Sequence, residues 1–147
     1  MLRVIGGVLV GYLATALLVT ASFLGAYWML GADGMLEAGG FEPRTLWSVA
    51  SLFLGFGGAL VGGFVSVAVG KSVKAATILA SLFLVVGLLM AATEKGRPAP
   101  TAPATRSGNE GFLTMVKNGK EPTWVSFSNP IIGAAGVLLG ATLRKRS

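Results

Sequence analysis

The side chains of this chain that could do chemistry lie in two short segments, and the first is VGKS at residues 69–72. This tetrapeptide has the ending of a phosphate-binding P-loop, in which backbone N–H groups and a lysine surround phosphates. The motif requires a glycine at position 65, where this chain has Val65, and it requires a strand before the loop. A long apolar segment precedes VGKS instead, so we interpret it as the end of a membrane span followed by two interfacial residues.

The second segment is SFSNP at residues 126–130, which contains a possible polar site made of Ser126, Ser128 and Asn129. Proline favours the first turn of a helix and asparagine favours the N-cap, so Pro130 could be the first helical residue with Asn129 as its N-cap. A helix from Pro130 to residue 143 would be too short to span a bilayer alone. Either residues 124–129 therefore form a kinked first turn, or the span starts below the membrane surface. The second arrangement would leave a small cavity whose helix N-terminus could attract an anion.

Most catalytic and metal-binding chemistry is excluded by residues that the chain lacks. It contains no histidine and no cysteine, which removes Ser-His hydrolysis, His-ligated haem, disulfides and zinc thiolates. No expected span carries an Asp, Glu, Lys or Arg in its interior, where transporters place their ionisable groups. Small drug exporters have a similar size and span number, but their buried carboxylate has no counterpart here. We therefore expect neither an enzyme nor a bound cofactor or metal ion.

The composition of the chain is that of a membrane protein. The 147 residues have a mean hydropathy of +0.74 and are 12% charged, against about a quarter in soluble domains. A bilayer core about 30 Å thick needs about 20 apolar residues per helix. We predict one all-α domain over residues 1–147, a bundle of four transmembrane helices with spans at residues 4–30, 45–70, 74–93 and 124–143. The first apolar stretch also resembles a signal peptide, but it exceeds a signal core in length, so we expect a retained span.

Two outer loops, at residues 31–44 and 94–123, are expected to connect these spans. The first loop is rich in glycine and acidic residues. The second begins with a Pro/Ala/Thr tract at residues 98–105, a composition suited to an extended spacer. An apolar piece at residues 111–116 follows it, and we expect this piece either to lie on the membrane surface or to cap the bundle.

The charges favour an orientation with both termini in the cytoplasm. The inner segments would then carry half of the 12 basic residues and none of the 6 acidic ones. Lysine and arginine gather on the cytoplasmic side, and all three tryptophans would lie at the outer surface as an aromatic belt. We therefore expect a multi-pass protein of a bacterial inner membrane with an N-in, C-in topology. The last span is followed by a cluster that could bind anionic lipid headgroups or serve only as a topological anchor, namely Arg144, Lys145 and Arg146.

Three glycines recur with one spacing in the second and fourth spans. The pattern GxxGxxxG is formed by Gly55, Gly58 and Gly62, and again by Gly133, Gly136 and Gly140. Spacings of three and four place each set on one helix face, where small residues allow the close contact by which helices associate in lipid. Each set also follows a Glu-Pro segment and a Trp, which favours two repeated α-hairpins, with convergence as the alternative. The sequence leaves open whether these faces meet each other or another protein.

Three segments, GYLATA in the first span, TLW before the second and W-x4-NPIIGAAGVLLGA in the fourth, resemble uncharacterised small bacterial four-helix inner-membrane proteins. The similarity covers most of the chain and implies no catalytic or binding residue. We expect a non-catalytic membrane subunit or scaffold whose glycine faces pack against itself, as a homo-oligomer, or against other membrane proteins. Membrane lipids are the further expected partners, and nucleic acid is not expected. The alternative is an oligomeric channel or transporter for a small solute.

Overall fold

The computed structural model describes residues 1–95, 111–119 and 121–146, so the tract at residues 98–105 lies outside the described part. Within it the elements are the helices α1 (Leu2–Met35), α2 (Thr45–Gly70), α3 (Val73–Lys95), α4 (Phe112–Asn118) and α5 (Thr123–Arg146). All but α4 are long and apolar enough to cross a membrane. The prediction of an all-α bundle with four spanning helices is confirmed, and the chain is a multi-pass membrane protein.

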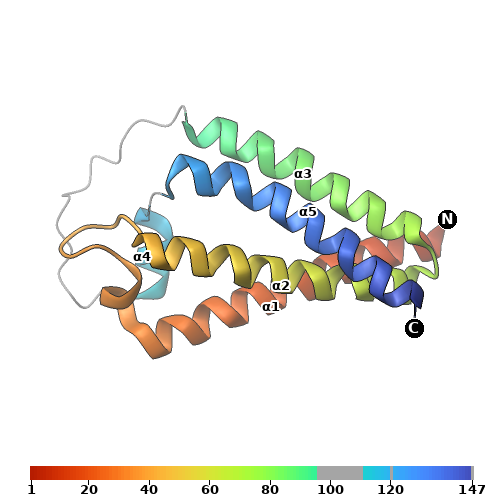
Figure 1. Cartoon of the computed structure of the whole chain (residues 1–147), viewed down its shortest axis with the longest axis horizontal. Helices are drawn as coiled ribbons and strands as arrows, with labels where there is room; N and C mark the ends of the chain where they lie inside the picture. The colour runs from red at the N-terminus through yellow and green to blue at the C-terminus, as the bar shows by residue number, and fades with distance from the viewer. Residues whose placement is uncertain (96–110, 120, 147) are drawn as a thin grey trace.

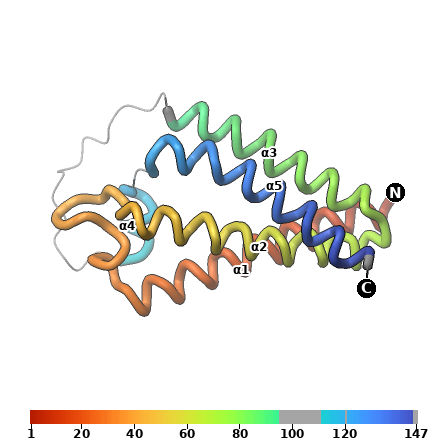
Figure 2. The backbone as a smooth tube through the Cα atoms, in the orientation of Figure 1, coloured from red at the N-terminus to blue at the C-terminus, as the bar shows by residue number. Residues whose placement is uncertain are grey.

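The four long helices form a bundle that opens toward one end (Figure 1). We call the end that carries both termini the terminal end, and the end that carries α4 the loop end. Helix α2 is central, since its most extensive contacts are with α1 and with α5, while α3 packs mainly on α5. Figure 2 shows that α1 and α3 diverge from the terminal end toward the loop end.

The first helix continues past its predicted end and is broken near its last turn. Gly31 has φ 63° and ψ −180°, a conformation that glycine adopts without steric cost. The chain then turns inward, so that Met35 and Leu36 expose only 1% and 4% of their surface. The Arg44 N–H donates a hydrogen bond to Met35 O at 2.9 Å, which closes the loop over residues 36–43. The first outer loop is thus folded against the bundle.

The apolar piece at residues 111–116 forms most of α4, which caps the loop end. Met115 is 7% exposed and belongs to the same buried cluster as Met35. The rings of Tyr27 and Phe112 meet edge to face with centroids 5.6 Å apart. Apolar contacts therefore attach the cap to α1, and of the two expected positions for this piece the structure has the cap.

Helix α5 begins at Thr123, within one residue of the predicted span, so residues 124–129 are helical, Pro130 is not the first helical residue and Asn129 is not its N-cap. Pro130 lies inside the helix and has no N–H to donate to the carbonyl of Ser126. A neighbouring helix accommodates the ring, since a Cβ built on Gly87 would lie 2.6 Å from Pro130 Cγ. A spanning segment must satisfy its backbone internally over its full length, and this requirement outweighs the local preference of proline for a helix start.

The glycines Gly58 and Gly62 lie against α1. A Cβ built on Gly62 would collide with Thr15 Oγ1 and lie 2.8 Å from Gly11 O. A Cβ built on Gly58 would lie 2.6 Å from Val19 Cγ2. These positions leave no room for a side chain unless α1 or its side chains move, so both glycines permit the close approach of α1 and α2.

The glycines Gly136 and Gly140 lie against α2 rather than α3. A Cβ on Gly136 would lie 2.9 Å from Phe56 O, and one on Gly140 would collide with Leu60 O. From the opposite side, Gly63 lies against the backbone of α5 in the same way, although it is outside the repeated pattern. Gly58 and Gly62 thus face the hairpin partner α1, while Gly136 and Gly140 face α2. These contacts do not repeat in the way that duplicated hairpins would require.

Candidate functional site

A groove opens on the side of the bundle where α1 and α3 diverge. Its volume is about 570 Å³, and residues of α1, α2, α3 and α5 line it. We call it the lateral groove, and its lining includes Thr15, Val19, Gly55, Val86, Met90 and Gly133. Val86 and Met90 expose 49% and 60% of their surface, so the groove is open to the outside of the bundle. At the end nearest the termini, the rings of Tyr12 and Phe83 meet edge to face at 6.1 Å.

Two glycines of the repeated pattern leave space for this groove. A Cβ built on Gly55 would approach only Asn129 Oδ1, at 3.8 Å. A Cβ built on Gly133 would approach only Phe83 Cδ2, at 3.5 Å, and both are ordinary contact distances. In each set the first glycine therefore lines the groove, while the second and third glycines lie in close helix contacts. The missing side chains at these two positions enlarge the groove without being needed for helix packing.

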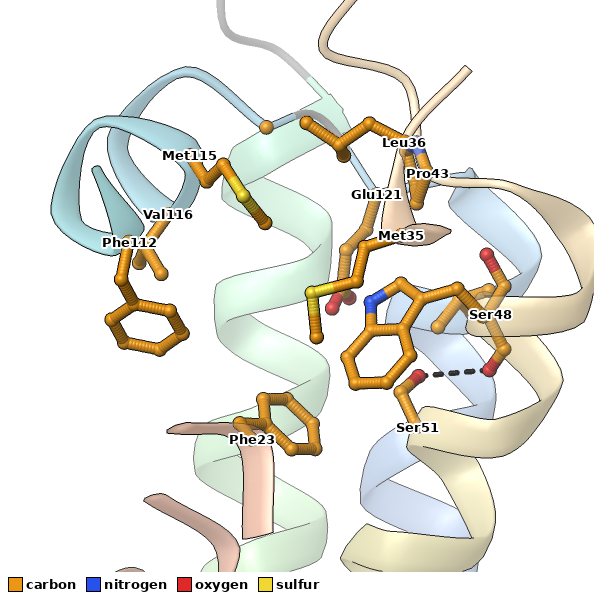
Figure 3. Close-up of a pocket in the computed structure, with 13 residues that line it drawn as sticks. Phe23, Met35, Leu36, Pro43, Ser48, Ser51, Phe112, Met115, Val116 and Glu121 are labelled. Carbon is orange, nitrogen blue, oxygen red and sulfur yellow. Dashed lines mark hydrogen bonds between the residues drawn. The ribbon is translucent and has the colours of Figure 1, made fainter. Parts of the chain in front are cut away.

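A second, smaller cavity lies beneath α4 at the loop end (Figure 3). Its volume is about 200 Å³, and its lining includes the rings of Phe23, Trp47 and Phe112 and the side chains of Met35 and Met115. We call it the cap chamber. The Phe23 and Trp47 rings meet edge to face with centroids 5.5 Å apart, which fixes one wall. Such a lining is apolar but rich in polarisable sulfur and aromatic faces.

The cap chamber also has a small polar side formed by the first turns of α2. Ser48 and Ser51 line it and expose 2% and 5% of their surface. The Ser51 hydroxyl donates to Ser48 O at 2.8 Å. The Ser48 hydroxyl has no hydrogen-bond partner among the described residues. A buried hydroxyl without a partner costs free energy, so it indicates a place where a polar group or a water molecule would be stabilised.

Glu121 is the residue that joins the two cavities, since it lines both the lateral groove and the cap chamber. In Figure 3 its carboxylate lies beside the Met35 side chain, on the wall of the chamber. The Glu121 residue as a whole is exposed, yet desolvation by the protein around its carboxyl raises the pKa of that carboxyl above its usual value, and the charge of Glu94 raises it further. Glu94 lines the loop-end part of the lateral groove. Both cavities therefore meet at a region of negative charge.

The polar residues predicted from SFSNP are only partly brought together. Ser126 and Asn129 line the lateral groove, whereas Ser128 is not among the residues that line it. Sequence reasoning did not single out Glu121 or Gly87 as site residues. The repeated Glu-Pro segments before the second and fourth spans contain Glu42 and Glu121, and both residues are exposed, but only Glu121 lines the two cavities.

The predicted basic cluster lies beside the α2–α3 turn at the terminal end. Arg144 and Lys145 line a hollow of about 340 Å³ together with Lys71. The Arg144 guanidinium lies 5.6 Å from the centre of the Phe64 ring. The side chain of Arg146 lies outside the described part. The turn adds Lys71 to the cluster, which the linear sequence did not indicate.

No protein-family model, curated protein or solved structure matches the chain. The resemblance to small bacterial four-helix inner-membrane proteins therefore stays a prediction. Among the described residues, no group of His, Cys, Asp or Glu could hold a metal ion. The site must be interpreted from its own geometry: an open apolar groove, an aromatic chamber and the carboxylate between them.

Proposed function

We propose that this chain is a non-catalytic integral membrane protein that binds an amphiphilic molecule from the surrounding bilayer, with the apolar chain of that molecule in the lateral groove. The observation that supports this proposal is the groove itself. It opens toward the region that lipid would occupy, its lining is largely apolar, and it ends at the carboxylates of Glu94 and Glu121. An apolar pocket with a few convergent polar groups is the usual form of a small-molecule site.

The volume of the groove favours a small amphiphile over a partner helix. Small-molecule sites have volumes of roughly 300–1,000 Å³, and the groove at about 570 Å³ lies within this range. A spanning helix is about 30 Å long and about 10 Å wide, which corresponds to about 2,400 Å³. A partner helix would therefore leave most of its volume outside the groove, whereas a slender chain could lie within it. An alkyl chain or another slender apolar group fits its dimensions better.

The subunit, scaffold and transport hypotheses receive less support from the packing. The glycines with close contacts lie against α1 and α2 of the same chain, so they offer no free face to a second protein. Association with other subunits or with a second copy therefore has no assigned surface. For the topology, we propose that the terminal end faces the cytoplasm of a bacterium, because Lys71, Arg144 and Lys145 gather there. The groove and the chamber would then lie in the outer half of the membrane.

A groove-filling substitution tests the proposal. Gly55→Leu places an isobutyl group in the groove at a position where a Cβ meets nothing closer than 3.8 Å. The matched control is Gly57→Leu in the same helix, where nothing lies within 4 Å of an added Cβ and where the residue does not line the groove. The probe is a dodecyl maltoside analogue with a photoreactive diazirine near the end of its alkyl chain, added to the full chain in lipid nanodiscs.

We expect saturable photolabelling of α1 and α3 residues of the groove, mapped by mass spectrometry. Gly55→Leu should reduce this labelling at least fivefold, while Gly57→Leu should leave it unchanged. Both variants should keep the same resistance to denaturing detergent, which separates loss of binding from loss of fold. Labelling that is spread evenly over all lipid-facing surfaces, or that is equal in the two variants, would overturn the proposal.

A further inference from the structure

The cap chamber has the composition of a site for an organic cation. Three aromatic rings, those of Phe23, Trp47 and Phe112, line a cavity of about 200 Å³ into which the Glu121 carboxylate is directed (Figure 3). Aromatic faces attract cations through the ring quadrupole, and this attraction is stronger where water is excluded. The nearby carboxylate supplies the opposite charge. We propose that the cap chamber binds the methylated ammonium headgroup of the amphiphile whose chain occupies the lateral groove.

The arrangement of the two cavities supports a single ligand that occupies both. Glu121 lines the groove and the chamber, so a headgroup beside its carboxylate in the chamber leaves the attached chain at the loop-end mouth of the groove. This inference rests on the proposed function, because it assigns the headgroup of the same ligand. Desolvation and then the charge of Glu94 raise the pKa of Glu121, and a cation beside this carboxylate would offset both causes.

The chamber favours a methylated ammonium over a primary one. A primary ammonium carries N–H donors that need acceptors, whereas a trimethylammonium group has none and is surrounded by methyl groups. Most of the lining is aromatic or apolar, so the side-chain oxygens of Ser48, Ser51 and Glu121 would have to satisfy all three N–H groups of a primary ammonium. Thioether sulfurs of Met35 and Met115 add polarisable contacts. Arg44 follows Pro43 of the lining, and its Nε donates a hydrogen bond to Leu36 O at 3.1 Å.

The test measures competition between headgroups on one alkyl chain. Dodecyltrimethylammonium, dodecylammonium and dodecyl maltoside compete with the photoreactive maltoside probe for the full chain in nanodiscs. A Trp28→Phe, Trp124→Phe background leaves Trp47 as the only tryptophan, since the chain has three, so its emission reports on the chamber wall. We expect dodecyltrimethylammonium to compete about tenfold more strongly than the maltoside and to change the Trp47 emission.

The variants Glu121→Gln and Phe112→Leu test the two attractions separately. Each variant should clearly reduce the preference for trimethylammonium over maltoside, by up to about tenfold, while the maltoside competes as before. The control Glu42→Gln removes an exposed acid of the first outer loop and should change neither. Equal competition by all three headgroups, stronger binding of the primary ammonium, or an unchanged preference in both variants would overturn the inference. In each of those cases intact labelling of the groove would leave the proposed function standing, and loss of that labelling would overturn both.

Discussion

The contact between α2 and α5 allows a sharp test of what the glycines do. A methyl group added at Gly140 would collide with Leu60 O, and it would also lie 2.8 Å from Leu60 C and 2.9 Å from Phe64 N. All three are backbone atoms, which cannot rotate away as a side chain does. Gly140→Ala must therefore push α5 away from α2 at the backbone of Leu60 and Phe64. The matched change Gly133→Ala in the same helix meets only Phe83 Cδ2 at 3.5 Å, an ordinary contact.

The size of the effect follows from two opposing terms. Alanine is favoured over glycine in a helix by up to about 1 kcal/mol, and both variants gain this term. Overpacking costs about 1–3 kcal/mol, and only Gly140→Ala pays it. We expect Gly133→Ala to leave the free energy of unfolding unchanged or raise it by up to about 1 kcal/mol. The free energy of unfolding of Gly140→Ala should be about 1–3 kcal/mol lower than that of Gly133→Ala, because the helix-propensity term is common to both variants and cancels in the difference.

The measurement is reversible unfolding in mixed micelles with increasing sodium dodecyl sulfate, followed by near-UV circular dichroism. A second pair on α2 repeats the comparison, since Gly63→Ala would collide with Val137 O while Gly57→Ala meets nothing within 4 Å. The double variant Gly63→Ala, Gly140→Ala should lose less than the sum of the single losses, because one separation of α2 from α5 relieves both collisions. If both members of each pair unfold at the same detergent fraction, close packing is not the role of these glycines.

The remaining predictions concern topology and pH. Because the chain has no cysteine, single cysteines at Ala38 and Ser72 should react with an impermeant maleimide from opposite sides of the membrane, with Ala38 accessible from outside; reaction of both from one side would contradict the four-span topology. The folded state holds the proton of Glu121 more tightly than the unfolded chain does, because desolvation and Glu94 raise its pKa above the usual 4.5. Stability should therefore fall as the pH rises from about 4.5 through the raised pKa, and Glu121→Gln should flatten that fall, whereas Glu42→Gln should not.

The four spans could be predicted from the sequence because their signal is the hydropathy of the whole segment. Lipid leaves a chain few ways to satisfy its backbone, so apolar length alone decides helix position to within a few residues. The same requirement explains why the fourth span starts near its predicted residue 124, although Asn129 and Pro130 are a local signal for a later helix start. The inward turn of Met35 and the cap formed by α4 depend on contacts between segments about 80 residues apart, which no local pattern contains.

The glycine spacing predicted which residues share a helix face but not what the face meets. In both sets the spacing is the same, yet Gly58 and Gly62 face α1 while Gly136 and Gly140 face α2. A period of three and four fixes the angular position of a residue on its own helix only. The partner is decided by how the helices are arranged around α2, and that arrangement is a property of all four spans together. The position of Glu121 between two cavities is likewise a property of the assembled helices, which the sequence alone does not indicate.

The apolar lining of the lateral groove bears on how the groove could select a ligand. A groove open to the bilayer is filled by whichever alkyl chain is next to it, because lipid chains are as apolar as its lining. Binding an apolar chain there offers little discrimination between one lipid and another. Selectivity would then come from the end of the groove, where Glu94 lies and where Glu121 lies between the groove and the aromatic chamber. A headgroup leaves water for this end of the groove only if its charge and shape suit the groups there. The few polar residues at the end of the groove would therefore determine which amphiphile the apolar groove binds.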